Sequence, residues 1–330
     1  MTVLSPTSSR NLSLGQRLLA PSSGALRRLL AHCQAPVIGI GGTGQPELTM
    51  DLIAAMLKSR GIRTAVGLGP ALGQMDSLGP EDRVLIELGS GLLRQAAGGL
   101  AMLVLGGLAA DEMAPDLARA ATGTAGCVVA NGDDARVLGL LAQAGVDPVR
   151  VSAHGGGGMA FIRGDELVIV DPQLQLERRV CRLDQTLLRG PAFQSNLLLA
   201  AAAAAIAGAE VEDLRRTLGA YQPGPDRLQR VATRQRVRWY SDGAANRPGL
   251  SALALRSLAG ERVVLIAGGR HGGQPLDRWR DAVGRHADAV LLYGSAGPEL
   301  AAALRSSPSL VVRCADLEDA VGTAHSLAQA

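Results

Sequence analysis

The sequence predicts an α/β fold, with a P-loop-like central domain on a mostly parallel sheet and a Rossmann-like C-terminal domain. Short apolar runs alternate with helical patterns from Pro36 onward, which is the order of βαβ units. The segment AYQPGPDRLQ, residues 220–229, interrupts this alternation with two prolines and a glycine, and a second α/β series follows it. We therefore expect an irregular N-terminus over 1–24, a central domain over 25–221 and a C-terminal domain over 226–330.

The central domain is predicted from continuous apolar runs and the helical patterns between them. Runs without alternation are typical of parallel strands that are covered on both faces. Residues 159–171 instead alternate about Gly164 and Asp165, which predicts a β-hairpin. The other strands are expected at 37–40, 63–68, 83–88, 101–105 and 127–131, and the helices at 24–32, 47–59, 111–121, 134–144, 193–208 and 211–218.

The C-terminal domain repeats the alternation of strands and helices after a hairpin-like segment over 230–242. Its expected strands lie at 262–268, 289–294 and 310–314, and its helices at 249–259, 276–285, 298–305 and at the end of the chain.

Composition limits the functional classes. The 330 residues are 47% hydrophobic and 2% aromatic, so the core is expected to consist of Leu, Val, Ile and Ala. A net charge of +3, without basic runs interleaved with aromatics, argues against a nucleic-acid surface. The four cysteines lie far apart in the sequence, and this spacing is typical of reduced thiols in a cytoplasmic protein. The longest apolar run, 197–209, is shorter than the ~20 residues of a membrane span.

The stretch GIGGTGQPELTM follows the first predicted strand and resembles a phosphate-binding loop in outline. A loop of the G-x4-G-K-[ST] type needs backbone N–H groups around the phosphates, a lysine on their outer oxygens and a hydroxyl for magnesium. Gly39 and Gly44 have the spacing of its glycines, but Gln45 and Pro46 stand where the lysine and the hydroxyl are needed. Glu47 places a carboxylate in the first helical turn, where it opposes bound phosphate. The loop is therefore a poor triphosphate site.

Two other interpretations of the same loop stay open. Gly39, Gly41 and Gly44 also match the dinucleotide fingerprint G-x-G-x-x-G between a strand and a helix. That fingerprint expects an acid about 20 residues further on, and none occurs before Asp76. The third interpretation is a tight turn whose glycines serve packing alone.

Eight segments in a constant order carry a family resemblance. They are GIGGTG (39–44), MLKSRGIRTAVGLG (56–69), LIELGSGLL (85–93), CVVANGDD (127–134), LLRGPAFQSNLLLAAAAAA (187–205), GPDRLQ (224–229), VRWYSDGAANRPG (237–249) and LIAGGRHGG (265–273). Over about residues 24–328 the chain thereby resembles the Mur ligase family, and specifically its MurD branch. The resemblance implies the fold described above and a family reaction in which ATP drives the addition of D-glutamate to UDP-N-acetylmuramoyl-L-alanine.

The resemblance also implies site residues. Glu87 corresponds to a magnesium-binding glutamate, although a rim carboxylate paired with an arginine is the alternative. Arg227 and Asp242 match residues that approach the nucleotide, with an interdomain salt bridge and an Asx-turn as their respective alternatives. The full set implied for nucleotide binding is Gly39, Gly42, Thr43, Gly44, Asn196, Arg227 and Asp242.

Departures from the family pattern concern the catalytic groups. Lys58 is the only lysine of the chain, and it lies within the helix after the loop. Ala244 and Gly272 occupy two positions where the family has lysine, and the segment LGGLAADEM lacks the family's metal-binding histidine. The N-terminal UDP-binding domain and the closing S-P-A-x-A-S-x-D segment are also expected to be missing.

From these departures we expect a MurD-like protein with impaired catalysis that acts in binding or regulation. ATP and magnesium are doubtful cofactors for such a site. The expected partners are a nucleotide or a cell-wall synthesis protein, without nucleic acid and without a membrane span. An active ATP-dependent amide ligase of the MurD type is the alternative, and a dinucleotide-binding enzyme is the third hypothesis.

Overall fold

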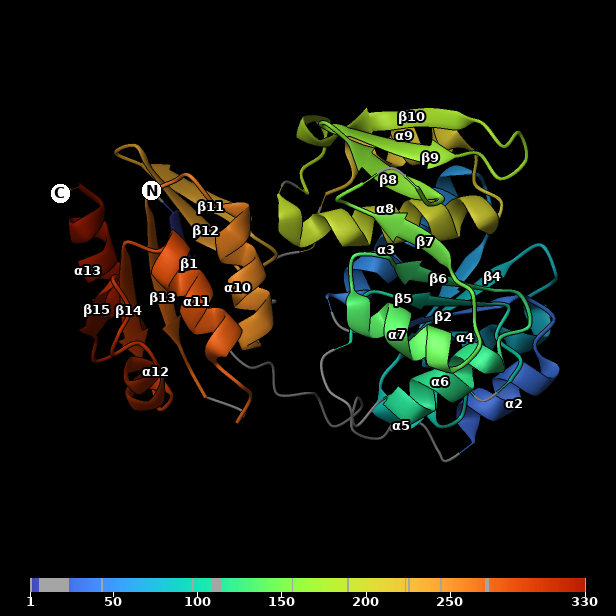
Figure 1. Ribbon diagram of the computed structural model, residues 1–330, viewed down its shortest axis with the longest axis horizontal. Helices are drawn as coiled ribbons and strands as arrows, with labels where there is room; N and C mark the ends of the chain where they lie inside the picture. The colour runs from blue at the N-terminus through green and yellow to red at the C-terminus, as the bar shows by residue number, and fades with distance from the viewer. Residues whose placement is uncertain are drawn as a thin grey trace. The chain divides into compact units, whose positions relative to one another are not determined.

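The computed structural model describes residues 2–5, 24–42, 44–96, 98–108, 114–155, 157–188, 190–222, 224, 226–243, 245–270 and 273–329. The chain divides into two compact units (Figure 1). A central unit comprises residues 12–189 and 193–222, and a C-terminal unit comprises 1–11, 190–192 and 223–330.

One sheet forms the core of the central unit. Its described strands are β2 (Val37–Gly41), β3 (Thr64–Val66), β4 (Arg83–Leu88), β5 (Met102–Leu105), β6 (Cys127–Asn131), β7 (Val149–Ser152), β8 (Ala160–Arg163), β9 (Glu166–Val170) and β10 (Glu177–Arg182). Their order is β10-β9-β8-β7-β6-β5-β2-β4-β3, and the strands from β3 to β8 run parallel. The mostly parallel sheet and the β8–β9 hairpin confirm the predictions.

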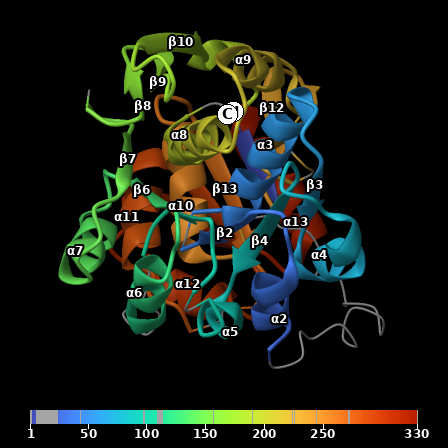
Figure 2. The same ribbon diagram turned by 90° about the vertical axis from the view of Figure 1, so that its right-hand side faces the viewer.

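Helices cover both faces of this sheet. They are α2 (Ala25–His32), α3 (Pro46–Ser59), α4 (Leu68–Gln74), α5 (Ser90–Leu93), α6 (Ala114–Thr122), α7 (Ala135–Gln143), α8 (Pro191–Ile206) and α9 (Val211–Ala220). On one face, α2, α4, α5, α6 and α7 pack their apolar side chains against alternate residues of β2, β4, β5 and β6. Figure 1 and Figure 2 show α3 and α8 on the opposite face. Burial on both faces explains why these strands read as continuous apolar runs.

The C-terminal unit has a second sheet. Its described strands are β1 (Thr2–Ser5), β11 (Gln229–Arg234), β12 (Val237–Ser241), β13 (Val263–Gly268), β14 (Ala289–Tyr293) and β15 (Leu310–Arg313), in the order β11-β12-β1-β13-β14-β15. All neighbours are parallel except β11 and β12, which form the predicted hairpin. Strand β1 was not predicted: it comes from a segment that we expected to be irregular, and it pairs with both β12 and β13.

Four helices of this unit are described: α10 (Pro248–Ser257), α11 (Asp277–His286), α12 (Gly297–Ala303) and α13 (Leu317–Gln329). The first three share one apolar cluster with the sheet, and α13 packs in a cluster on the other face. Trp279 is buried on the α11 side, while Trp239 stacks with His325 of α13 at 6.1 Å between ring centroids. Among the described residues, no helix combines the length and the apolarity that a membrane crossing needs.

Candidate functional site

The glycine loop follows β2, in the middle of the central sheet, and neighbouring segments crowd Gly39 and Gly42. A Cβ atom on Gly39 would lie 2.5 Å from Cδ1 of Leu88. Gly42 has φ +90°, and a Cβ there would lie 2.3 Å from the carbonyl oxygen of Gly107. Position 42 therefore requires glycine for packing, whether or not a phosphate binds, while a side chain at position 39 would have to displace the Leu88 side chain.

Gln45 occupies the position where a phosphate-binding loop carries lysine. It is only 8% exposed, and its backbone is left-handed, with φ 64° and ψ 61°. It also forms the N-cap of α3, because its carbonyl oxygen accepts hydrogen bonds from the backbone N–H groups of Leu48 and Thr49. The side chain at this position is thus folded into the protein, whereas a phosphate-binding lysine must project into the loop.

The first turn of α3 is also poorly suited to an anion. Pro46 is the first helical residue, where its fixed φ favours the helix but its nitrogen has no hydrogen to donate. Glu47 follows, is exposed, and adds negative charge at the positive end of the helix dipole. Both features reduce the attraction of this helix end for phosphate.

Asn196 of α8 forms hydrogen bonds with the glycine loop and with the first turn of α3. Its Nδ2 donates to the carbonyl oxygens of Gly44 and Gln45, at 2.5 and 3.1 Å, and to Oγ1 of Thr49 at 2.9 Å. Asn196 is 1% exposed, and its Oδ1 accepts no hydrogen bond within the described part of the chain. Since two carbonyl oxygens face it, the amide must present nitrogen to the loop, which fixes its orientation.

Glu87 lies at the carboxyl end of β4, the strand next to β2, in register with Ile40. Parallel sheets bind ligands at this edge, so the position fits the role that the resemblance implies. Within the described residues, however, no group of three His, Cys, Asp or Glu side chains could hold a metal ion. Magnesium usually needs one or two carboxylates together with substrate phosphates. The Glu87 carboxylate would therefore have to act together with substrate phosphates to hold magnesium.

Lys58 cannot replace the missing loop lysine. It is exposed near the end of α3, and it follows Pro46 by twelve positions. At 1.5 Å per residue, this spacing puts its Cα about 18 Å along the helix axis from the loop. Its charge therefore lies at the opposite end of the helix from any bound phosphate.

Arg227 and Asp242 belong to the C-terminal unit. Asp242 is 8% exposed, and its Oδ1 accepts a 2.9 Å hydrogen bond from the backbone N–H of Leu228. Burial raises the pKa of this carboxyl group to about 6, against the opposing effects of that hydrogen bond and of the Arg227 charge. The neighbouring Asp226 accepts a 2.5 Å hydrogen bond from the hydroxyl of Ser241. The end of β12 is thus tied to the segment that enters the C-terminal unit.

The structure brings some of the predicted site residues close together. Gly44 and Asn196 are in direct contact, with Gly39 and Gly42 in the same loop and Glu87 on the adjacent strand. Thr43, Ala244 and Gly272 lie outside the described residues. Two features of the site were not predicted: the burial of Gln45 and the hydrogen bond that Thr49 accepts from Asn196. A polar residue on the buried face of a helix, such as Thr49, is a signal for a hydrogen-bonding partner.

Comparisons with known proteins agree with the resemblance in sequence. The family profile described as "Mur ligase, glutamate ligase domain" matches residues 226–330. The UDP-N-acetylmuramoylalanine–D-glutamate ligase of Symbiobacterium thermophilum is 28% identical over 96% of this chain and 73% of its own length. The enzyme of the same name from a Roseiflexus species is 30% identical over 95% of this chain and 72% of its own length. The chain belongs to the Mur ligase family. Its curated relatives place it on the MurD branch.

Solved structures support the fold of this Mur ligase family member. MurF from Acinetobacter baumannii superimposes with a TM-score of 0.72 over 99% of this chain and 78% of that chain, at 16% identity. Folylpolyglutamate synthase from Mycobacterium tuberculosis, solved with ADP and AMPPCP, gives 0.66 over 96% of this chain and 91% of that chain, also at 16% identity. At such identities the likeness concerns the fold alone.

Proposed function

We propose that this Mur ligase family member is a MurD-like homologue of the peptidoglycan-precursor ligases that is catalytically impaired and acts as a binding or regulatory protein. The named reaction of its relatives joins D-glutamate to UDP-N-acetylmuramoylalanine. In the proposal this chain keeps the fold of those ligases but does not transfer a phosphoryl group. Its partners are a nucleotide bound weakly or a protein of cell-wall synthesis.

One observation carries the proposal: Gln45 is a buried, left-handed N-cap residue where a phosphate-binding loop needs a lysine that projects towards the bound phosphates. Phosphoryl transfer depends on cationic groups that neutralise charge as it develops on the transferring group. The loop region offers Pro46 and Glu47 instead, and the only lysine lies at the far end of α3.

The energetic consequence is large. Loss of a single preorganised stabilising group commonly costs about 2.7–4 kcal/mol in the transition state. Since each 1.36 kcal/mol is about tenfold in rate, absence of the lysine and the magnesium hydroxyl together predicts a loss of at least about 10³. Such a protein would turn over too slowly to serve as the cell's ligase, which leaves binding or regulation.

Calorimetric titration of the full chain with ATP, with and without magnesium, tests the proposal. We expect no magnesium-dependent binding in the micromolar range, and no ADP release with UDP-N-acetylmuramoyl-L-alanine and D-glutamate. Binding of a cell-wall synthesis protein is tested by titrating the purified D-glutamate ligase of the same cell against this chain. Micromolar, magnesium-dependent ATP binding together with D-glutamate-dependent ADP release would refute the proposal.

An active amide ligase is the second candidate, and the retained residues favour it. Glu87 stands at the ligand-binding edge of the central sheet, and Asn196 contacts the loop. Arg227 and Asp242 are both present in the C-terminal unit. Formation of ADP only when both substrates are present would select this candidate over the first.

A further inference from the structure

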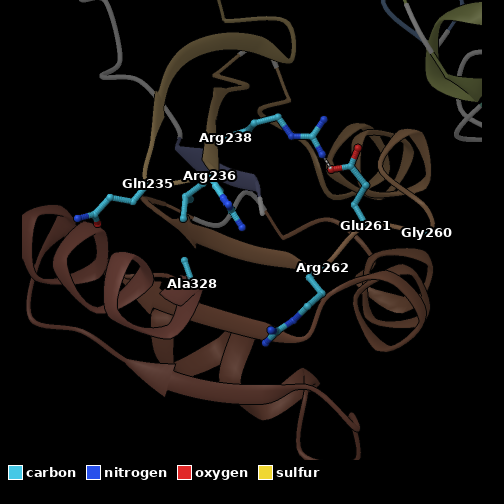
Figure 3. A pocket seen from close by; sticks show the side chains of 8 residues that line it. Gln235, Arg236, Arg238, Gly260, Glu261, Arg262 and Ala328 are labelled. Atoms are coloured by element: carbon cyan, nitrogen blue, oxygen red, sulfur yellow. Dashed lines mark hydrogen bonds and ion pairs between the residues drawn. The ribbon is translucent and has the colours of Figure 1, made fainter. Parts of the chain in front are cut away.

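A hollow in the C-terminal unit has no part in the site described above. It measures about 410 Å³ and is lined by Gln235, Arg236, Val237, Arg238, Gly260, Glu261, Arg262 and Ala328 (Figure 3). Its volume falls within the range of about 300–1,000 Å³ that ligand pockets usually have. Arg238 and Arg262 stand at the amino ends of β12 and β13, whereas parallel sheets ordinarily bind ligands at the carboxyl ends.

The lining is strongly basic. Three arginines face one glutamate, so the lining side chains carry a net charge of +2 (three positive, one negative). Arg238 pairs with Glu261. Within the described residues, Arg236 and Arg262 form no ion pair. Figure 3 shows the side chains of Arg236 and Arg262 on two different walls of the hollow, one from the β11–β12 turn and one from the start of β13.

The sheet sets the spacing of these groups. Strand β1 lies between β12 and β13, with Thr2 in register with both Arg238 and Val263. Adjacent strands are about 4.8 Å apart, so the starts of β12 and β13 are separated by about 10 Å. Arginines that flank such a gap can bind oxygens of the same anion from two sides. The α13 end closes a third side, where Gln329 is hydrogen-bonded to Gln235.

The turn that carries Arg236 is conformationally costly. Gln235 and Arg236 form the two-residue loop between β11 and β12, with φ of 49° and 65°. A hairpin turn with two left-handed residues strongly prefers Asn-Gly, and an ordinary side chain there costs about 1–2 kcal/mol. A strained residue whose charged side chain enters a hollow is an indication of function.

We propose that this hollow binds a small anion with two or more phosphoryl groups, held by the Arg236 and Arg262 guanidiniums. Arginine is suited to this ligand because its planar donors bind phosphate oxygens in pairs. Pyrophosphate itself and the phosphate tail of a nucleotide share the recognised chemistry. The inference is independent of whether the glycine loop binds a nucleotide, since that loop belongs to the other unit.

The test is calorimetric titration of the full chain with inorganic pyrophosphate at low ionic strength, with ADP and adenosine as parallel ligands. We expect pyrophosphate to bind, and added NaCl to weaken the binding because the site is exposed. Binding of ADP without binding of adenosine would identify the phosphate tail as the recognised group. Absence of pyrophosphate binding to the wild-type chain would overturn the proposal.

Matched variants locate the site. The double variant Arg236→Gln/Arg262→Gln should weaken pyrophosphate binding at least tenfold. Arg305→Gln/Arg313→Gln removes the same charge from exposed positions of the same unit, and should change it less than twofold. If both double variants lost the same pyrophosphate affinity, the binding would depend only on the net charge of the unit, and the proposed site would be refuted.

A third variant separates binding from folding. Arg236→Gly relieves the left-handed turn, so it should raise the denaturation midpoint of the C-terminal unit while it weakens pyrophosphate binding. A merely damaged variant would lose both properties. Unchanged affinity in Arg236→Gly would contradict the role assigned to the side chain.

Discussion

The side-chain amide of Asn196 donates a hydrogen bond to the backbone carbonyl oxygen of Gly44, although 152 positions separate the two residues. This contact joins α8 to the loop at the centre of the first sheet. The same amide also reaches Gln45 and Thr49, so it bridges the loop and the first turn of α3. The loop is therefore held by groups of the protein itself in the conformation that buries Gln45.

Replacing Asn196 by alanine should destabilise the central unit by about 2–4 kcal/mol. The carbonyl oxygen of Gly44 and the hydroxyl of Thr49 would lose a donor, whereas the Gln45 carbonyl oxygen keeps its hydrogen bonds from Leu48 and Thr49. Unsatisfied buried polar groups cost about 1–3 kcal/mol each, partly offset by the orphaned Oδ1 that also disappears. Hydrogen exchange should accelerate in the backbone amides of Leu48 and Thr49. Ser195→Ala, on the same helix and only half-buried, is the control and should leave these amides unchanged.

Gly42 and Gly44 form a matched pair, because both have left-handed backbones but only one is crowded. Gly44→Ala should cost about 1–2 kcal/mol, the penalty of a Cβ in that conformation, since nothing lies within 4 Å. Gly42→Ala should cost several kcal/mol more, because the Cβ meets the Gly107 carbonyl oxygen. Thermal unfolding followed by circular dichroism gives the comparison. Equal losses would contradict the assignment of Gly42 to packing.

Restoring the missing loop groups should restore phosphate binding in part. The double variant Gln45→Lys/Pro46→Ser supplies the lysine, the hydroxyl and a backbone N–H, and we expect its ATP affinity to rise at least tenfold over wild type. Calorimetry with magnesium measures the gain. Leu187→Lys/Pro191→Ser introduces the same residues outside the loop and should not bind ATP more tightly. A wild-type chain that already binds as tightly as the restored variant would contradict the inference drawn from Gln45.

Most of the sheet could be predicted because its strands are buried on both faces and read as apolar runs. β4 and β6 have the predicted bounds. β10 was missed because it is a mostly exposed edge strand of the sequence ERRVCR, without an apolar pattern. β1 was missed because it is four residues long and its partners lie more than 230 positions away.

The site was harder to predict than the fold. The glycine spacing marked the loop, but a sequence cannot show that Gln45 is buried, since glutamine is mostly exposed in proteins. The contact of Asn196 with the loop depends on how α8 packs against α3, so it arises only from the tertiary structure. The raised pKa of Asp242 likewise results from its burial in the folded protein, which the neighbouring residues in the sequence do not predict.

Asp242 should make the C-terminal unit less stable as the pH rises from about 4 to about 6. The folded carboxyl group has a pKa of about 6, above its ordinary value of 3.8, so in this window the folded state holds a proton that the unfolded chain has lost. Stability then falls with rising pH, because the unfolded state binds fewer protons. Above about pH 6 the penalty is constant, and the shift corresponds to about 3 kcal/mol.

The variant Asp242→Asn isolates this effect, because its side-chain oxygen can still accept the Leu228 hydrogen bond. Its free energy of unfolding should equal that of wild type below pH 4 and exceed it by up to about 3 kcal/mol at pH 7. Denaturant unfolding followed by tryptophan fluorescence reports on this unit alone, since Trp239 and Trp279 are the only tryptophans. Asp288→Asn, an exposed acceptor of a backbone N–H, is the control. A difference between Asp242→Asn and wild type that stayed constant from pH 4 to 7 would show that Asp242 is charged throughout and that its burial is compensated.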